Sequence, residues 1–150
     1  MSTEPTTPTP PHDWIPPGGG VRWTRVGELG WHALTLPMHR GDRVLAELGE
    51  DSGAVIQMDG EQQLTWLIEP WAEAVRHLRE REGVTLAGDD GSYLFVPGMT
   101  RARLCWWRVA PEPGRLLTDA GRLAEAYAVV QRSVGRTAES RPDRARGGVW

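Results

Sequence analysis

Asp59 and Glu61 form the one Asp-x-acid pair of this sequence, a spacing that could hold a metal ion. In an extended segment, side chains two residues apart lie on the same side, so both carboxylates could share one divalent cation. Gly60 between them favours another interpretation, because Asp-Gly is typical of a tight turn in which the Asp side chain bonds to the backbone. We expect the turn, and we keep Asp59 and Glu61 as weak metal candidates.

Other sequence patterns that carry enzyme chemistry are missing. The chain has no Gly-x-Ser-x-Gly motif and no glycine-rich phosphate loop, and its single cysteine, Cys105, excludes an internal disulfide. Cys105 lies among apolar residues of a predicted strand, so we expect an inert, buried thiol. No spacing typical of metal ligands links the four histidines, which are His12, His32, His39 and His77. The sequence therefore predicts no catalytic residue, no metal site and no cofactor.

Tryptophan is the other candidate residue type, since eight of the 150 residues are Trp. Four of them fall on predicted core elements, where packing is the default role of so large a side chain. If such rings were exposed beside a basic groove, they could stack on nucleic-acid bases, or they could anchor a protein partner. The candidate binding surface consists of Trp66, Trp71, Trp106, Trp107, Arg103 and Arg108.

Charge and composition limit the class of protein. The net charge of −3 argues against non-specific nucleic-acid binding, although residues 71–150 carry thirteen Arg against ten acids. Every basic residue is Arg and there is no Asn, which is typical of a GC-rich genome such as that of an actinobacterium. The N-terminus has neither the basic start nor the apolar run of a signal peptide, and no stretch approaches the ~20 apolar residues of a membrane span. We therefore expect a cytoplasmic protein without membrane contact.

The length predicts one domain between two flexible ends. Residues 1–20 are rich in Pro, Thr and Gly and should form a disordered arm, on which we expect Trp14 and Ile15 to be exposed. The Arg-rich segment 136–150 should form a disordered tail. Residues 21–135 remain as a single α/β domain, which is large enough to bury a core without disulfides or metal.

Apolar runs predict five or six strands. Segments 54–58 and 63–69 flank the Asp-Gly turn and should form a β-hairpin, with Leu64, Trp66 and Ile68 on one face. Segments 31–36, 84–86 and 92–96 are further predicted strands. Segment 103–109 is apolar on both faces, which favours a central position in the sheet.

Helical spacing predicts about three helices. They cover residues 41–48, residues 70–82 with Trp71, Val75 and Leu78 as the apolar stripe, and a last helix capped by Thr118 or Asp119. The predicted fold class is therefore α+β, with a largely antiparallel sheet.

Two segments resemble a known family. Residues 83–98 read GVTLAGDDGSYLFVPG and residues 105–111 read CWWRVAP, and together they resemble the second half of the N-terminal domain of bifunctional DNA primase/polymerases. The segment LTWLIEP at 64–70 is similar to the strand that precedes this pattern in the family. The resemblance covers roughly residues 54–120.

The resemblance implies a metal-binding Asp-x-Asp pair, a nucleotide-contacting His and a further acid, and the sequence departs from each. Leu64 or Thr65 occupies the His position, and Asp59 and Glu61 stand too close to that strand for the family's layout. Two-metal nucleotidyl transfer without these ligands cannot neutralise the phosphates. The sequence thus predicts a non-catalytic relative, acting as a binding or accessory module associated with nucleotides or nucleic acid. A protein-interaction or regulatory module with Trp anchors is the alternative.

Overall fold

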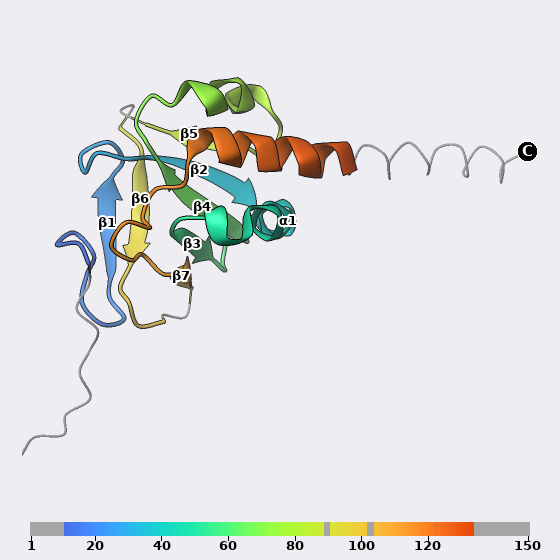
Figure 1. Ribbon diagram of the computed structural model, residues 1–150. Coiled ribbons are helices and arrows are strands. Elements are labelled where there is room, and N and C mark those ends of the chain that lie inside the picture. Colours follow the sequence, from blue (N-terminus) through green and yellow to red (C-terminus); the bar gives the residue numbers. More distant parts are fainter. Residues whose placement is uncertain (1–10, 89–90, 102–103, 134–150) are drawn as a thin grey trace, which may run out of the picture.

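The computed structural model describes residues 11–88, 91–101 and 104–133 (Figure 1). Over these residues the fold is α+β, with seven strands in two antiparallel sheets and three helices, which confirms the predicted class. The first half of the predicted arm, Arg103, and the whole predicted tail at 136–150 lie outside the described residues.

The larger sheet has five strands in the order β5-β2-β4-β3-β7. Its strands are β2 (His32–Pro37), β3 (Val55–Met58), β4 (Gln63–Ile68), β5 (Thr85–Ala87) and β7 (Cys105–Val109). The predicted hairpin is confirmed, because β3 and β4 pair antiparallel with Val55 opposite Trp66 and Met58 opposite Gln63. The order places β4, which is buried along almost its whole length, at the centre.

Strand β7 is an edge strand, so its predicted central position is wrong. Val109 pairs with Val55 and Trp107 pairs with Ile56, which leaves Arg108 as an extra residue in a β-bulge. The bulge turns Val109 toward the helices, while Trp107 and Cys105 point to the other side. Both sides of the strand are apolar because each meets a different core.

The smaller sheet pairs β1 (Val21–Arg25) with β6 (Tyr93–Pro97). Strand β1 was not predicted, since three of its residues are polar and four are exposed. It forms because β6 offers it an antiparallel partner distant in sequence, with Trp23 opposite Phe95. The two strands run across one end of the larger sheet (Figure 1).

The helices gather on one face of the five-stranded sheet (Figure 1). Helix α1 (Met38–Leu48) begins three residues before its predicted start, and the short 3₁₀ turn η1 (Gly49–Asp51) follows it. A Cβ at Gly41 would lie 3.0 Å from the Leu64 side chain, so glycine allows α1 to approach the sheet closely. The last helix, described over 120–133, is capped by Asp119, whose Oδ2 accepts a hydrogen bond from the Arg122 N–H at 2.9 Å.

The predicted helix at 70–82 is a 3₁₀ helix, η2 (Glu73–Glu80). Its buried side chains, Val75 and Leu78, are three residues apart, and Ala72 continues the same spacing. Three residues per turn place such positions on one side, which suits a 3₁₀ helix. Trp71 lies outside this stripe, and it is exposed rather than part of the core.

Two apolar clusters flank the five-stranded sheet. The helix-side core joins the sheet to the helices, and its members larger than alanine are Leu34, Leu36, Val44, Leu48, Val55, Leu64, Trp66, Ile68, Val75, Leu78, Leu123, Tyr127 and Val130. The groove-side core joins the sheet to β1 and β6, and its members are Ile15, Val26, Trp31, Ala33, Ala54, Ile56, Leu67, Val96, Cys105 and Trp107. None of the helices in the described ranges is long and apolar enough to cross a membrane.

The second half of the predicted arm packs against the groove-side core. Ile15 is 3% exposed, and Trp14 packs against the same cluster. Backbone hydrogen bonds from the Gly98 N–H to the Gly20 carbonyl (2.8 Å) and from the Thr100 N–H to the Gly18 carbonyl (3.0 Å) hold this segment. The amino-acid composition of residues 1–20 predicted a disordered arm, because composition carries no information about contacts with residues eighty positions away in the sequence.

Candidate binding groove

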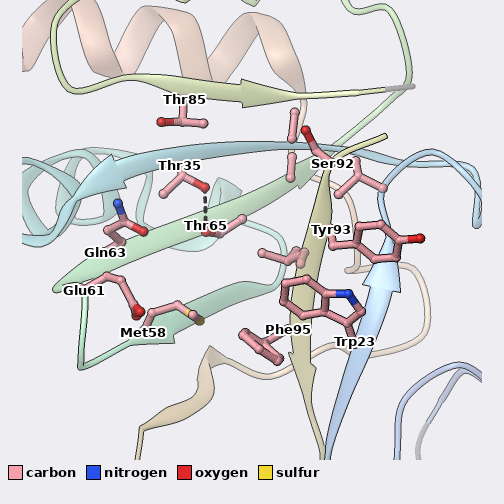
Figure 2. A pocket seen from close by; sticks show the side chains of 14 residues that line it. Trp23, Thr35, Met58, Glu61, Gln63, Thr65, Thr85, Ser92, Tyr93 and Phe95 are labelled. Carbon is pink, nitrogen blue, oxygen red and sulfur yellow. Dashed lines mark hydrogen bonds between the residues drawn. The ribbon is translucent and has the colours of Figure 1, made fainter. Parts of the chain in front are cut away.

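The two sheets leave a groove of about 330 Å³ beside the groove-side core (Figure 2). The floor comes from β2, β4 and β5 of the larger sheet, and the opposite wall comes from β1 and β6. The groove forms because β1 and β6 lie across the end of the larger sheet and cover only part of this face. Its volume falls within the roughly 300–1,000 Å³ of ligand pockets.

A row of three threonines crosses the floor of the groove. Thr35 of β2 pairs with Thr65 of β4 on one side and with Thr85 of β5 on the other. Neighbouring strands lie roughly 4.8 Å apart, so the row is about 10 Å long. The hydroxyls of Thr35 and Thr65 share a hydrogen bond of 2.8 Å (Figure 2). Exposure rises along the row from the buried Thr65 through the half-buried Thr35 to the exposed Thr85.

Three exposed aromatic side chains form the wall of the groove. Trp23, Tyr93 and Phe95 are 56%, 49% and 40% exposed. The Trp23 and Tyr93 rings are nearly parallel, at 4° with centroids 5.2 Å apart, and Phe95 leans on Trp23 at 4.3 Å. The strand pairing of β1 with β6 positions them, because Trp23 lies directly opposite Phe95 and diagonal to Tyr93.

The polar lining of the groove is neutral except for one carboxylate. Glu61 and Gln63 lie at the end of the floor where β4 begins, and Ser92 lies near the wall (Figure 2). No Arg or His lines the groove among the residues that the structure describes. The arrangement can therefore offer hydroxyl, amide and carboxylate hydrogen bonds beside exposed aromatic rings.

The weak metal candidates are not brought together. Asp59 Oδ1 accepts a hydrogen bond from Gln57 Nε2 (2.6 Å), and Oδ2 accepts one from Trp106 Nε1 (3.0 Å). These two bonds, the first more strongly, lower the pKa of the Asp59 carboxyl, and the charge of Arg101 adds to them against a small effect of burial. Asp59 thus lies on the helix side of the sheet, whereas Glu61 lines the groove. Across the three described segments, no three His, Cys, Asp or Glu residues cluster as metal ligands.

The predicted tryptophan surface is divided by the fold. Trp66 is fully buried and its Nε1 donates to Ser52 Oγ at 3.2 Å, while the buried Trp107 donates to the Pro97 carbonyl at 2.8 Å. These two rings belong to the two cores and cannot bind a partner. Trp106 is half-buried, with the Arg101 guanidinium 4.0 Å above its ring.

Arg108 is exposed and bonded to neighbouring side chains, and Trp71 lies elsewhere on the surface. Arg108 pairs with Asp42 at 3.0 Å and donates to Gln57 Oε1 at 2.8 Å. Trp71 is 63% exposed, its ring and the His32 ring are T-shaped with centroids 5.0 Å apart, and its backbone N–H donates to His32 Nδ1 at 3.2 Å. A hollow of about 200 Å³ lies beside it and is also lined by Arg76 and Arg79.

Cys105 is buried in the groove-side core, as predicted. Burial, followed by the negative charges of Glu61 and Asp59, raises the pKa of its thiol to about 11. The thiol is therefore protonated at neutral pH, which makes it a poor nucleophile.

Sequence reasoning missed the groove residues. Neither Trp23 nor the threonines of the floor belong to the binding surface that the sequence predicts. The sequence did contain one indication of the site, because each of two apolar strands has a threonine near its middle, Thr35 and Thr65. Only the pairing of the strands places these two side by side. The chain matches no protein-family model, and it has no match among the curated proteins or the solved structures compared with it.

Proposed function

We propose that this protein is a non-catalytic binding domain, related to the primase/polymerase fold, whose ligand lies in the groove between the two sheets. The exposed aromatic wall opposite the threonine row carries the proposal. Large apolar side chains left in water beside ordered hydroxyls are typical of a ligand site, because ligand binding buries the apolar surface and keeps the hydroxyls bonded.

The surroundings of the two candidate acids support binding rather than nucleotidyl transfer. Asp59 already accepts hydrogen bonds on both oxygens, and Glu61 lies on the other face of the sheet. A two-metal mechanism needs carboxylates that converge on ions about 4 Å apart. The kinship with primase/polymerases rests on the pattern at 83–98 and 105–111 and stays a proposal.

The charge of the groove narrows the ligand to molecules without phosphate. Glu61 is its one charged residue in the described part of the chain, and a phosphate would meet a carboxylate there instead of an Arg. Any association with nucleotides or nucleic acid would therefore need a different surface of the protein.

Ligand-observed NMR with a library of uncharged fragments tests the groove. We expect fragments to bind the full chain, and Trp23→Ala to abolish binding because it removes the centre of the aromatic wall. Leu104→Ala is the matched control, since Leu104 is exposed to a similar degree (66%) but does not line the groove. Absence of binding to the wild type, or equal loss in both variants, would contradict the proposal.

A primer-synthesis assay with Mg²⁺ or Mn²⁺ tests the non-catalytic part of the proposal. We expect no nucleotide incorporation by the wild-type chain. Incorporation that Asp59→Ala abolishes would show that Asp59 acts as a metal ligand after all.

Trp71 favours a second function, recognition of an acidic segment of a protein partner. Its backbone adopts a φ of 59°, which costs a residue other than glycine about 1–3 kcal/mol and holds the ring in water. Arg76 and Arg79 beside it supply the complementary charge. Binding of an acidic, aromatic-containing peptide should weaken with added salt and be lost in Trp71→Ala. Binding that Trp71→Ala leaves unchanged would exclude this surface.

A further inference from the structure

We infer that the ligand of the groove is a neutral carbohydrate, whose sugar ring packs on the exposed rings of Trp23 and Tyr93 while its hydroxyl groups bond to the threonine row. This inference rests on the proposed function and names the chemistry of the ligand. It is carried by three features of the groove: the shape of the aromatic wall, the kind of polar group on the floor, and the charge.

Two rings of the aromatic wall are stacked and the third is inclined. Trp23 and Tyr93 lie 4° from parallel with centroids 5.2 Å apart, and Phe95 is tilted by 54° against Trp23. All three rings are at least 40% exposed and line the groove, so the wall presents aromatic faces and edges to a ligand. A sugar ring presents a face of C–H groups that packs on an exposed aromatic face. Aromatic faces attract organic cations as well, so choline is included among the probes of the test.

The floor supplies both donors and acceptors in quantity. A threonine hydroxyl carries one donor and two acceptor sites, and the Gln63 amide carries donors and acceptors as well. The bond between Thr35 and Thr65 uses one donor of the pair, which leaves one donor and several acceptor sites for a ligand. Thr85, at the exposed end of the row, is the most accessible of the three. A polyhydroxylated ligand needs this mixture, because each of its hydroxyls both donates and accepts.

Glu61 completes the polar set without requiring a charged ligand. A carboxylate accepts hydrogen bonds from two neighbouring hydroxyls, and such charge-assisted bonds are stronger than neutral ones. Glu61 is exposed at the end of the floor, where it can reach a ligand that spans the threonine row.

Other hollows of the described chain suit different chemistry. The hollow beside Trp71 measures about 200 Å³ and contains Arg76 and Arg79. A hollow of about 240 Å³ between η2 and the last helix contains Arg81 and Arg132. Both are basic, whereas the groove combines several neutral hydroxyls with exposed aromatic rings.

Isothermal titration of the full chain with three sets of probes tests the inference: neutral mono- and oligosaccharides, uncharged nucleosides, and choline. We expect a saccharide to bind with an affinity that does not change with ionic strength, because the ligand is neutral. Trp23→Ala should weaken binding at least about tenfold, and Trp23→Phe should restore part of it. Thr85→Val, which keeps the shape and removes one hydroxyl, should weaken binding about fivefold.

The alternative outcomes separate the two proposals. If a nucleoside or choline binds in a Trp23-dependent way and no saccharide does, the carbohydrate inference is wrong and the groove remains the binding site. Choline binding lost in Glu61→Gln would identify a cation site. If no probe binds to a wild-type chain that circular dichroism shows to be folded, both proposals fail.

Discussion

The two faces of the five-stranded sheet are built from the same strands and serve different purposes. On the helix side, Leu34, Leu64 and Trp66 are fully buried beneath α1, η2 and the last helix. On the other side, their neighbours Thr35 and Thr65 face a groove that β1 and β6 only partly cover. Because successive residues of a strand point to opposite faces, one strand can supply both a core and a site.

Under the proposed function, this difference separates stability from binding within the fold. The helix side buries a continuous apolar surface, whose removal from water is the dominant favourable contribution to folding. The groove side leaves three aromatic rings in water and places hydroxyls where a core would hold methyl groups. Substitutions on the helix side should therefore reduce mainly stability, and substitutions on the groove side should reduce mainly ligand binding.

Trp66→Ala should give the largest loss of stability. The change removes a fully buried ring, leaves a cavity in the helix-side core and removes the hydrogen bond that the Ser52 hydroxyl accepts from the ring. We expect a loss of about 3–5 kcal/mol in the free energy of unfolding. Urea denaturation followed by circular dichroism measures it, and Trp23→Ala should cost less than about 1.5 kcal/mol. Equal losses in the two variants would mean that the wall is as much a part of the core as Trp66.

Gly98→Ala should release the N-terminal segment from the groove-side core. A Cβ at Gly98 would collide with the backbone carbonyls of Gly18 and Pro16, so the segment must move away. We expect a loss of about 1–3 kcal/mol, typical of overpacking, together with exposure of Ile15. Limited proteolysis should then cut the variant between residues 14 and 20 faster than the wild type. Unchanged cleavage would show that this segment contributes little to the core.

The helix side was largely predictable from the sequence, and the groove side was not. Alternation at Leu64, Trp66 and Ile68 predicted the buried face of β4, because that pattern is local and the hydrophobic effect acts on it directly. The spacing of Leu123, Tyr127 and Val130 predicted the last helix for the same reason. These elements follow from periodicities within a dozen residues.

The groove depends on pairings that no local pattern contains. Trp23 reaches Phe95 across about seventy positions, and Thr35 reaches Thr65 and Thr85 across thirty and fifty. The edge position of β7 was missed because a single bulged residue, Arg108, exchanges the faces along that strand. The candidate tryptophans were selected by residue type. Trp71 is exposed and Trp66 is buried, and this difference depends on the fold.

Thr65→Val should change stability little and weaken ligand binding. Valine keeps the shape of the buried side chain but removes the hydroxyl that bonds to Thr35, so we expect a loss of about 1 kcal/mol. Ligand affinity should fall further than stability, because the Thr35 hydroxyl loses the partner that orients it toward the groove. Urea denaturation and calorimetric titration on the same preparation compare the two effects. A variant with full affinity and reduced stability would show that the Thr35–Thr65 bond serves only the sheet.

Asp59→Asn should have the smallest effect, and it should depend on pH. The hydrogen bonds from Gln57 and Trp106 hold the pKa of the Asp59 carboxyl below its ordinary value of 3.8. A folded-state pKa below the unfolded one means that the carboxylate stabilises the fold above about pH 4, and that this contribution is lost as the pH falls through the folded-state value. Wild type should therefore exceed Asp59→Asn in stability at pH 7, by less than about 1 kcal/mol because the group is partly solvated. Urea denaturation should show the stabilities of the two proteins converging as the pH falls below 3.8 and the carboxyl becomes protonated. A difference that persists after protonation would mean that the asparagine side chain packs poorly, and that charge at Asp59 does not stabilise the helix side.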